Sequence, residues 1–144
     1  MAIRIKTFLM VKDGTVYKRA NTGEIYGDGK RHDLPRGAVF RATWYENEDG
    51  SQNNWTGPDG QAWFVVLPQN PDESGVWHWH IDGPASNCTL PDDKIHKCWC
   101  RHGEAPDFTV DKNGVTCQAG GGSIWVQMPN GFHGFLRDGY IVNG

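Results

Sequence analysis

Phe135-Leu136-Arg137-Asp138-Gly139-Tyr140-Ile141-Val142 reads as two short β-strands joined by a tight turn. Aspartate-glycine between β-forming residues is a strong hairpin signal, because both turn positions need a positive φ. The stretch therefore predicts a β-hairpin near the end of the sequence, and the same signal recurs upstream.

Hairpin and strand signals are spread along the whole chain. Ile3–Val11 leads through Asp13-Gly14 into Thr15–Tyr17, and Asn113-Gly114 separates Phe108–Val110 from Val115–Cys117. Further strands are predicted at Ala38–Tyr45, Ala62–Leu67, Val76–Ile81, Lys97–Cys100 and Ser123–Met128. No segment carries a convincing helical pattern. We expect one all-β domain over residues 1–144, in which short antiparallel strands and hairpins form a sandwich, roll or distorted barrel.

The composition excludes several classes of function. A formal net charge of −3 argues against a protein whose main role is to bind nucleic acid, since that role needs a basic surface. No apolar run approaches the roughly 20 residues that span a bilayer, and the first residues lack a secretion signal. We therefore expect a cytosolic protein, in which thiols bind metal more often than they form disulfides.

The four cysteines lie close together in the sequence, and two of them belong to an alternating pattern. Every second position of one short segment holds a possible metal ligand: His96, Cys98, Cys100 and His102. On a β-strand these side chains would share one face, about 6.6 Å apart, so one ion could bind two neighbours but not all four. The other ligands must come from elsewhere, and Cys88 and Cys117 are the natural candidates.

Three interpretations of the cysteines remain open. A structural zinc ion bound by Cys88, Cys98, Cys117 and one of His96 or Cys100 would join three segments, because zinc prefers four Cys or His ligands. A disulfide from Cys88 to Cys98 or Cys117 would have a similar effect in an oxidising environment such as a virion. Alternatively, the thiols pack as small hydrophobic groups. Structural zinc is the leading interpretation.

A second alternating segment is Trp77-His78-Trp79-His80-Ile81-Asp82. On a strand its aromatic face is most simply core. The face with His78, His80 and Asp82 is a candidate binding, acid–base or metal surface, and the structural alternative is a merely solvated face. An open metal site there would indicate a small metal-dependent hydrolase.

The tryptophans are expected to divide between core and surface. Trp44, Trp63, Trp77 and Trp125 lie in strand-like contexts and are predicted to be core. Trp55 lies in the polar segment Glu46–Asp59 and is the best candidate for an exposed aromatic contact.

Several short motifs resemble a group of small tailed-phage and prophage proteins. They are Ala85-Ser86-Asn87-Cys88-Thr89, His96-Lys97-Cys98-Trp99, Arg101-His102-Gly103-Glu104, Val110-Asp111-Lys112 with Gly114 and Thr116-Cys117, and His133-Gly134-Phe135-Leu136. Cys100 lies outside the motifs of that group, so the resemblance favours His96 as the fourth ligand beside Cys88, Cys98 and Cys117. It implies a phage setting and no particular reaction.

The combined expectation is a phage accessory protein that acts by binding, without catalysis, and is held together by the Cys/His cluster. Its partner would be a host protein, a defence-signalling nucleotide or another subunit, met by Trp55, His78, His80 and Asp82. The alternatives are a virion component, such as a capsid decoration or tail-associated protein, and the small hydrolase. The expected location is the cytoplasm of the infected host or the virion. Edge strands and exposed aromatic residues also predict that the chain can self-associate.

Overall fold

The computed structural model describes residues 3–68, 76–85, 88–90, 92–93, 96–113, 117, 124–125 and 133–143. Within these ranges the regular structure is almost entirely β, which confirms the predicted fold class. In the described part of the chain the helices are two single 3-10 turns, η1 (Arg31–Asp33) and η2 (Thr43–Tyr45). Among the described residues, none forms a helix with the length and apolar character needed to cross a bilayer.

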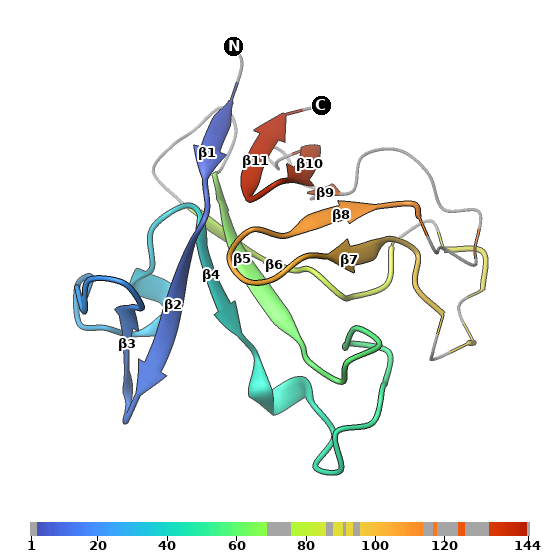
Figure 1. Cartoon of the computed structure of the whole chain (residues 1–144), viewed down its shortest axis with the longest axis horizontal. Coiled ribbons are helices and arrows are strands. Elements are labelled where there is room, and N and C mark those ends of the chain that lie inside the picture. The colour runs from blue at the N-terminus through green and yellow to red at the C-terminus, as the bar shows by residue number, and fades with distance from the viewer. Residues whose placement is uncertain are drawn as a thin grey trace.

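One sheet has five strands in the order β3-β2-β4-β5-β6 (Figure 1). The strands are β2 (Phe8–Asp13), β3 (Val16–Arg19), β4 (Ala38–Arg41), β5 (Trp63–Pro68) and β6 (Val76–His80). All neighbours are antiparallel except β2 and β4, which run parallel with Phe8 opposite Ala38. The parallel pair arises because residues 20–37 return the chain from β3 to the other side of β2.

A second sheet joins the two ends of the described chain. Its strands are β1 (Arg4–Lys6), β11 (Tyr140–Asn143), β10 (His133–Arg137) and β9 (Ile124–Trp125), in that spatial order. The predicted hairpin is confirmed, since Asp138 and Gly139 have φ values of 50° and 76° between the paired residues Arg137 and Tyr140. The expected single strand Ile3–Val11 is wrong, because it breaks at the buried Thr7 into β1 and β2.

The first hairpin forms with its turn one residue later than predicted. Asp13 pairs with Val16, so the two-residue turn is Gly14-Thr15 rather than Asp13-Gly14. Gly14 has a φ of 63°, the conformation that a turn with glycine at its first central position requires.

A separate two-stranded sheet pairs β7 (Cys100–His102) with β8 (Thr109–Asp111), Arg101 lying opposite Val110. The predicted hairpin at Asn113-Gly114 falls largely on residues 114–116, and most of the predicted strand Ser123–Met128 falls on 123 and 126–128. Both lie outside the described residues, apart from the short strand β9.

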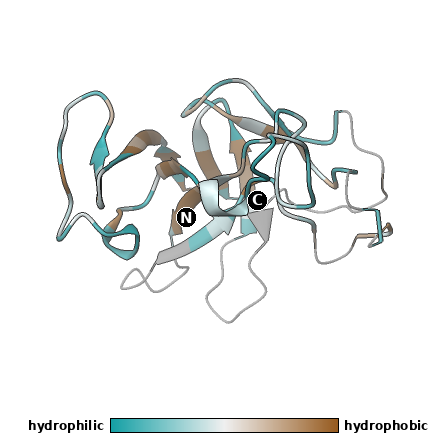
Figure 2. Ribbon diagram, turned by 90° about the horizontal axis from the view of Figure 1, so that it is seen from below, coloured by the Kyte–Doolittle hydropathy of each residue, from teal (hydrophilic) through white to brown (hydrophobic). Residues whose placement is uncertain are grey.

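The apolar strands β4 and β5 have a hydrophobic core on each face. One core lies towards the C-terminal strands and contains Val39, Trp63, Val65, Leu67, Ile81, Phe108, Val110, Leu136 and Ile141. The other lies towards β2 and β3 and contains Met10, Tyr17, Leu34, Ala38, Phe40, Ala42, Ala62, Phe64 and Val66. Figure 2 shows the most hydrophobic strands gathered in the middle of the molecule, with hydrophilic turns outside.

Candidate metal centre

Three thiols and one imidazole converge beside the two-stranded sheet. The ligand atoms of Cys88, His96, Cys98 and Cys117 all lie within 4.8 Å of one another. His96 Nε2 is 3.0 Å from Cys88 Sγ and 3.5 Å from Cys98 Sγ. These four residues are the set predicted from the sequence, and they lie close enough together to hold a metal ion.

The surroundings of the cluster orient its atoms for metal binding. His96 Nδ1–H donates to the carbonyl of Asp93, so the lone pair of Nε2 points into the cluster. The backbone N–H of Ala85 donates to Cys98 Sγ over 3.4 Å, and the N–H of Leu90 donates to Cys88 Sγ over 3.3 Å. Such N–H···S bonds stabilise negative charge on sulfur.

Burial separates the cluster from solvent. Cys98, Cys117 and His96 are buried, and Cys88 is half-buried at the edge. Burial, followed by the neighbouring thiols, raises the pKa of Cys98 to about 12. A thiolate at this position therefore needs a bound cation to stabilise its charge. All four cysteines of the chain are free thiols in this structure.

The predicted strand Lys97–Cys100 is wrong except at Cys100, so the alternating segment His96–His102 does not form one continuous strand. Only Cys100–His102 pair as a strand, and the residues before them form a loop around the cluster. Cys100 lies opposite Asp111 on β8 and takes no part in the cluster. His102 Nε2–H donates to Asp111 Oδ1 over 2.8 Å at the surface. The loop lets His96 and Cys98 turn inward while Cys100 and His102 follow the sheet.

His78 and His80 contact aromatic rings. His78 meets the ring of Phe40 edge-on at 5.7 Å, and burial lowers its pKa. His80 stacks on Trp55 with the ring centroids 5.1 Å apart, and its Nε2–H donates to the carbonyl of Trp55 over 2.8 Å. Burial also lowers the pKa of His80. His80 therefore holds the segment around Trp55 against β6, whereas His78 packs on β4.

Asp82 lies apart from the two histidines because β6 ends at His80. Its Oδ1 accepts a 3.0 Å bond from Arg101 Nε, and both side chains are buried. Arg101 Nη2 also donates to Asp59 over 2.8 Å and to the carbonyl of Gln61 over 3.3 Å. Among the described residues, His78, His80 and Asp82 do not form a metal-binding group.

Arg101 is a central residue that the sequence did not single out. It lies on β7 and links two acidic residues from separate segments, Asp59 and Asp82. Burial lowers the pKa of Arg101, but Asp82 and Asp59 raise it more, so the net pKa is above its ordinary value. A buried arginine flanked by sequence-distant carboxylates leaves no local pattern, so only the tertiary structure identifies it.

The exposed aromatic residues differ partly from the prediction. Trp55 is 40% exposed, as predicted, and Trp63 is buried. Trp44 was expected in the core but is 48% exposed, because the predicted strand Ala38–Tyr45 ends at Arg41 and gives way to η2. Arg31 lies over the Trp44 ring at 5.0 Å. The side chains of Trp77 and Trp125 lie outside the described part of the structure.

No protein family model matches this chain, and neither a curated protein nor a solved structure matches it at a significant level.

Proposed function

We propose that this chain is a non-enzymatic binding protein that is stabilised by a zinc ion at Cys88, His96, Cys98 and Cys117. The observation that carries the proposal is the convergence of three thiols and one correctly oriented imidazole within 4.8 Å. Soft sulfur and imidazole donors favour zinc over the oxygen-preferring cations.

The number of protein ligands supports a structural role for the ion. Four ligands complete the tetrahedron that zinc adopts in structural sites, whereas catalytic zinc keeps a position open for water. The ligands come from the loop after β6, the loop before β7 and the segment at Cys117. One ion would therefore fix three loops that have little hydrophobic packing of their own.

The surface around Trp44 and Trp55 is the proposed contact with a partner protein. Tyr45 lies between the two rings, 6.0 Å from Trp44 and 5.4 Å from Trp55. His80 supports Trp55 from beneath, and Arg31 covers Trp44. Tryptophan, tyrosine and arginine are the residue types that dominate binding energy at protein interfaces. Because these rings are already fixed by their neighbours, they lose little conformational entropy when a partner binds, which favours this surface as a docking site.

The proposed setting is a phage or prophage, as an accessory protein or a virion component, and it rests on the sequence motifs alone. Mass spectrometry of purified particles separates the two roles. Detection of the chain in particles supports the virion role, and its restriction to the infected cytoplasm supports the accessory role.

The zinc site is tested by elemental analysis of chain purified in reductant without added metal. We expect near-stoichiometric zinc and a fold that is insensitive to reductant. A metal-free protein whose structure is lost in reductant would contradict the proposal and favour a disulfide.

The contact surface is tested by capture of a partner from a bacterial lysate. Trp44→Ala and Trp55→Ala should lose the partner while retaining zinc. Ile25→Ala is the control, since Ile25 is 49% exposed outside this aromatic group. If all three variants captured the partner equally well, this surface would be excluded as the contact.

A further inference from the structure

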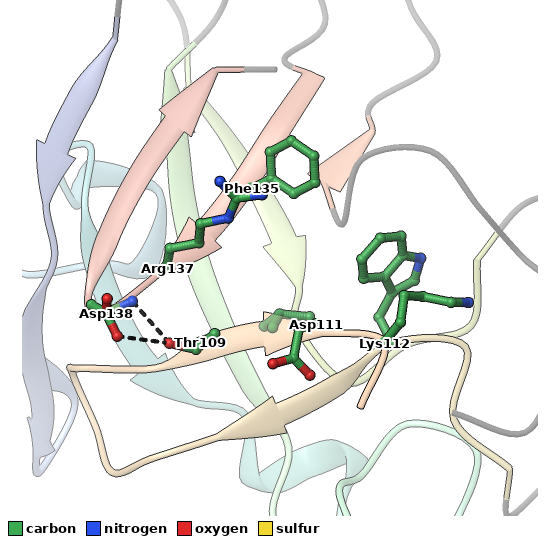
Figure 3. A pocket seen from close by; sticks show the side chains of 8 residues that line it. Thr109, Asp111, Lys112, Phe135, Arg137 and Asp138 are labelled. Atoms are coloured by element: carbon green, nitrogen blue, oxygen red, sulfur yellow. Dashed lines mark hydrogen bonds between the residues drawn. The ribbon is translucent and has the colours of Figure 1, made fainter. Parts of the chain in front are cut away.

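A pocket of about 430 Å³ lies between β8 and β10 (Figure 3). Its walls include Trp99, Thr109, Asp111, Lys112, Phe135 and Arg137. The volume lies within the range of small-molecule sites, roughly 300–1,000 Å³. The turn at Asp138 closes one end, because its N–H donates to Thr109 Oγ1 over 2.9 Å.

Two aromatic rings in this pocket are each accompanied by a cation. Arg137 Cζ is 4.2 Å from the centre of the Phe135 ring, and Lys112 Nζ is 5.0 Å from the centre of the Trp99 ring. In Figure 3 the guanidinium of Arg137 points along β10 towards Phe135 and away from Asp138. Each ring therefore has a cation over one of its faces, so the pocket walls combine aromatic surface with positive charge.

The Trp99 wall is held by the segment that forms the metal cluster. Trp99 directly follows Cys98, and its half-buried ring packs against Cys98 and Cys117 as well as the main core. Lys112 Nζ donates to the carbonyl of Cys98 over 2.9 Å. An ion in the cluster would therefore fix this wall before any ligand binds, which lowers the entropy cost of binding.

The acidic residues of the pocket are already engaged. Asp111 Oδ1 accepts bonds from His102 and from the backbone N–H of Asn113, and Asp138 Oδ1 accepts one from Thr109. Arg137, in contrast, forms no ion pair with any residue in the described part of the chain. The pocket therefore presents an arginine to an anionic group from outside.

We propose that this pocket binds a nucleoside monophosphate. Any nucleobase can stack on an aromatic side chain, because every base has a flat π-face. Arginine binds a phosphate group with two parallel hydrogen bonds. Within the described part of the chain, the hydrogen bonds that Asp111 and Asp138 accept use only Oδ1, and a carboxylate has further lone pairs, so the ribose hydroxyls can donate to these two residues. These carboxylates would repel the additional charge of a triphosphate or a nucleic-acid strand, which agrees with the net charge of −3. This site is separate from the Trp44 and Trp55 surface and does not depend on the partner proposed there.

The test is calorimetric titration of the full chain with AMP and with GMP, beside adenosine and inorganic phosphate. We expect at least one nucleotide to bind with a Kd of about 1 mM or tighter, and each fragment to bind at least about tenfold more weakly. Arg137→Ala should weaken the nucleotide at least about tenfold. Arg4→Ala is the matched control, because the exposed Arg4 also lies over an aromatic ring, that of Tyr140, but outside the pocket.

Three results would overturn the assignment. They are no saturable binding of either nucleotide, equal weakening of nucleotide binding by Arg4→Ala and Arg137→Ala, or equally tight binding of inorganic phosphate alone. Zinc content and partner capture by the Trp55 variants are measured separately, so failure of this proposal is distinguishable from failure of the proposed function. Arg137 is exposed, so its removal leaves the core intact.

Discussion

Cys98 and Cys100 are separated by one residue but have different surroundings. Cys98 is buried in the metal cluster, where it receives a backbone N–H bond. Cys100 is half-buried on β7 opposite Asp111. The pair provides an internal comparison, because the same Cys→Ser change removes a proposed ligand at one position and a non-ligand thiol at the other.

Cys98→Ser should lower zinc affinity by at least about 100-fold and lower the melting temperature, because metal binding contributes to folding. Cys100→Ser should keep the affinity of the unmodified chain. Competition with a chromophoric zinc chelator measures both affinities. Equal losses in the two variants would show that Cys98 has no special role in metal binding.

Asp82 gives a pH dependence that can be isolated by one substitution. Burial raises its pKa to about 6, against the opposing effects of Arg101 and Lys97, while Asp59 raises it further. The folded chain therefore holds this proton more tightly than the unfolded chain. The resulting stabilisation is complete below about pH 4 and is lost as the pH rises through about 6.

Asp82→Asn removes this titration and leaves the histidines unchanged. Relative to the variant, the free energy of unfolding of the original chain should fall by about 1 kcal/mol between about pH 5 and about pH 7.5. Urea unfolding across this range measures the difference. If the free energy of unfolding changed with pH in the same way in both proteins, the role assigned to Asp82 would be contradicted.

At the scale of elements, Arg101 docks the segment of residues 46–62 onto β7. Its guanidinium contacts Asp59 and the carbonyl of Gln61, and Gly57 lies directly against it. A Cβ at Gly57 would be 2.4 Å from Arg101 Nη2. That nitrogen is the end of a side chain, but its hydrogen bonds restrict its movement.

Gly57→Ala should therefore destabilise the fold by about 1–3 kcal/mol through overpacking. Gly83→Ala is the matched control, since its Cβ would make only ordinary contact, 3.4 Å from Trp55. We expect that control to cost less than about 1 kcal/mol. Thermal unfolding of both variants measures the difference, and a similar loss in each would mean that Arg101 moves aside freely.

The elements also show which features a sequence can predict. The Asp138-Gly139 hairpin is local, and its turn residues nearly determine it. The break at Thr7 and the parallel pairing of β2 with β4 depend on strands far away in the sequence, so no local signal marks them. The same holds for the site. The spacing of His96 and Cys98 predicts their proximity, whereas the separation of Asp82 from His80 follows from where β6 ends and from the position of Arg101.

The whole molecule combines a conventional hydrophobic core with a region held by polar and metal-ligating groups. The core between β4, β5, β2 and β3 is built mainly from buried aliphatic and aromatic side chains. The loops around the metal cluster have only a small hydrophobic core of their own. It consists of Cys98 and Cys117, with Ala85, Cys88 and Trp99 packed against them. Burial of apolar area therefore stabilises the first region, and the proposed ion stabilises the second.

Removal of the metal should consequently loosen one region and not the other. After treatment with a strong chelator under reductant, amide hydrogen exchange at residues 96–102 and 109–112 should accelerate by at least about tenfold. Exchange at residues 38–41 and 63–67 should change little, because both faces of β4 and β5 remain covered. Mass spectrometry of exchanged peptides before and after chelation measures this contrast, and restoring zinc should reverse it. Uniform acceleration across all these residues would mean that the cluster supports the entire fold, whereas no change anywhere would mean that the four side chains do not hold a stabilising ion.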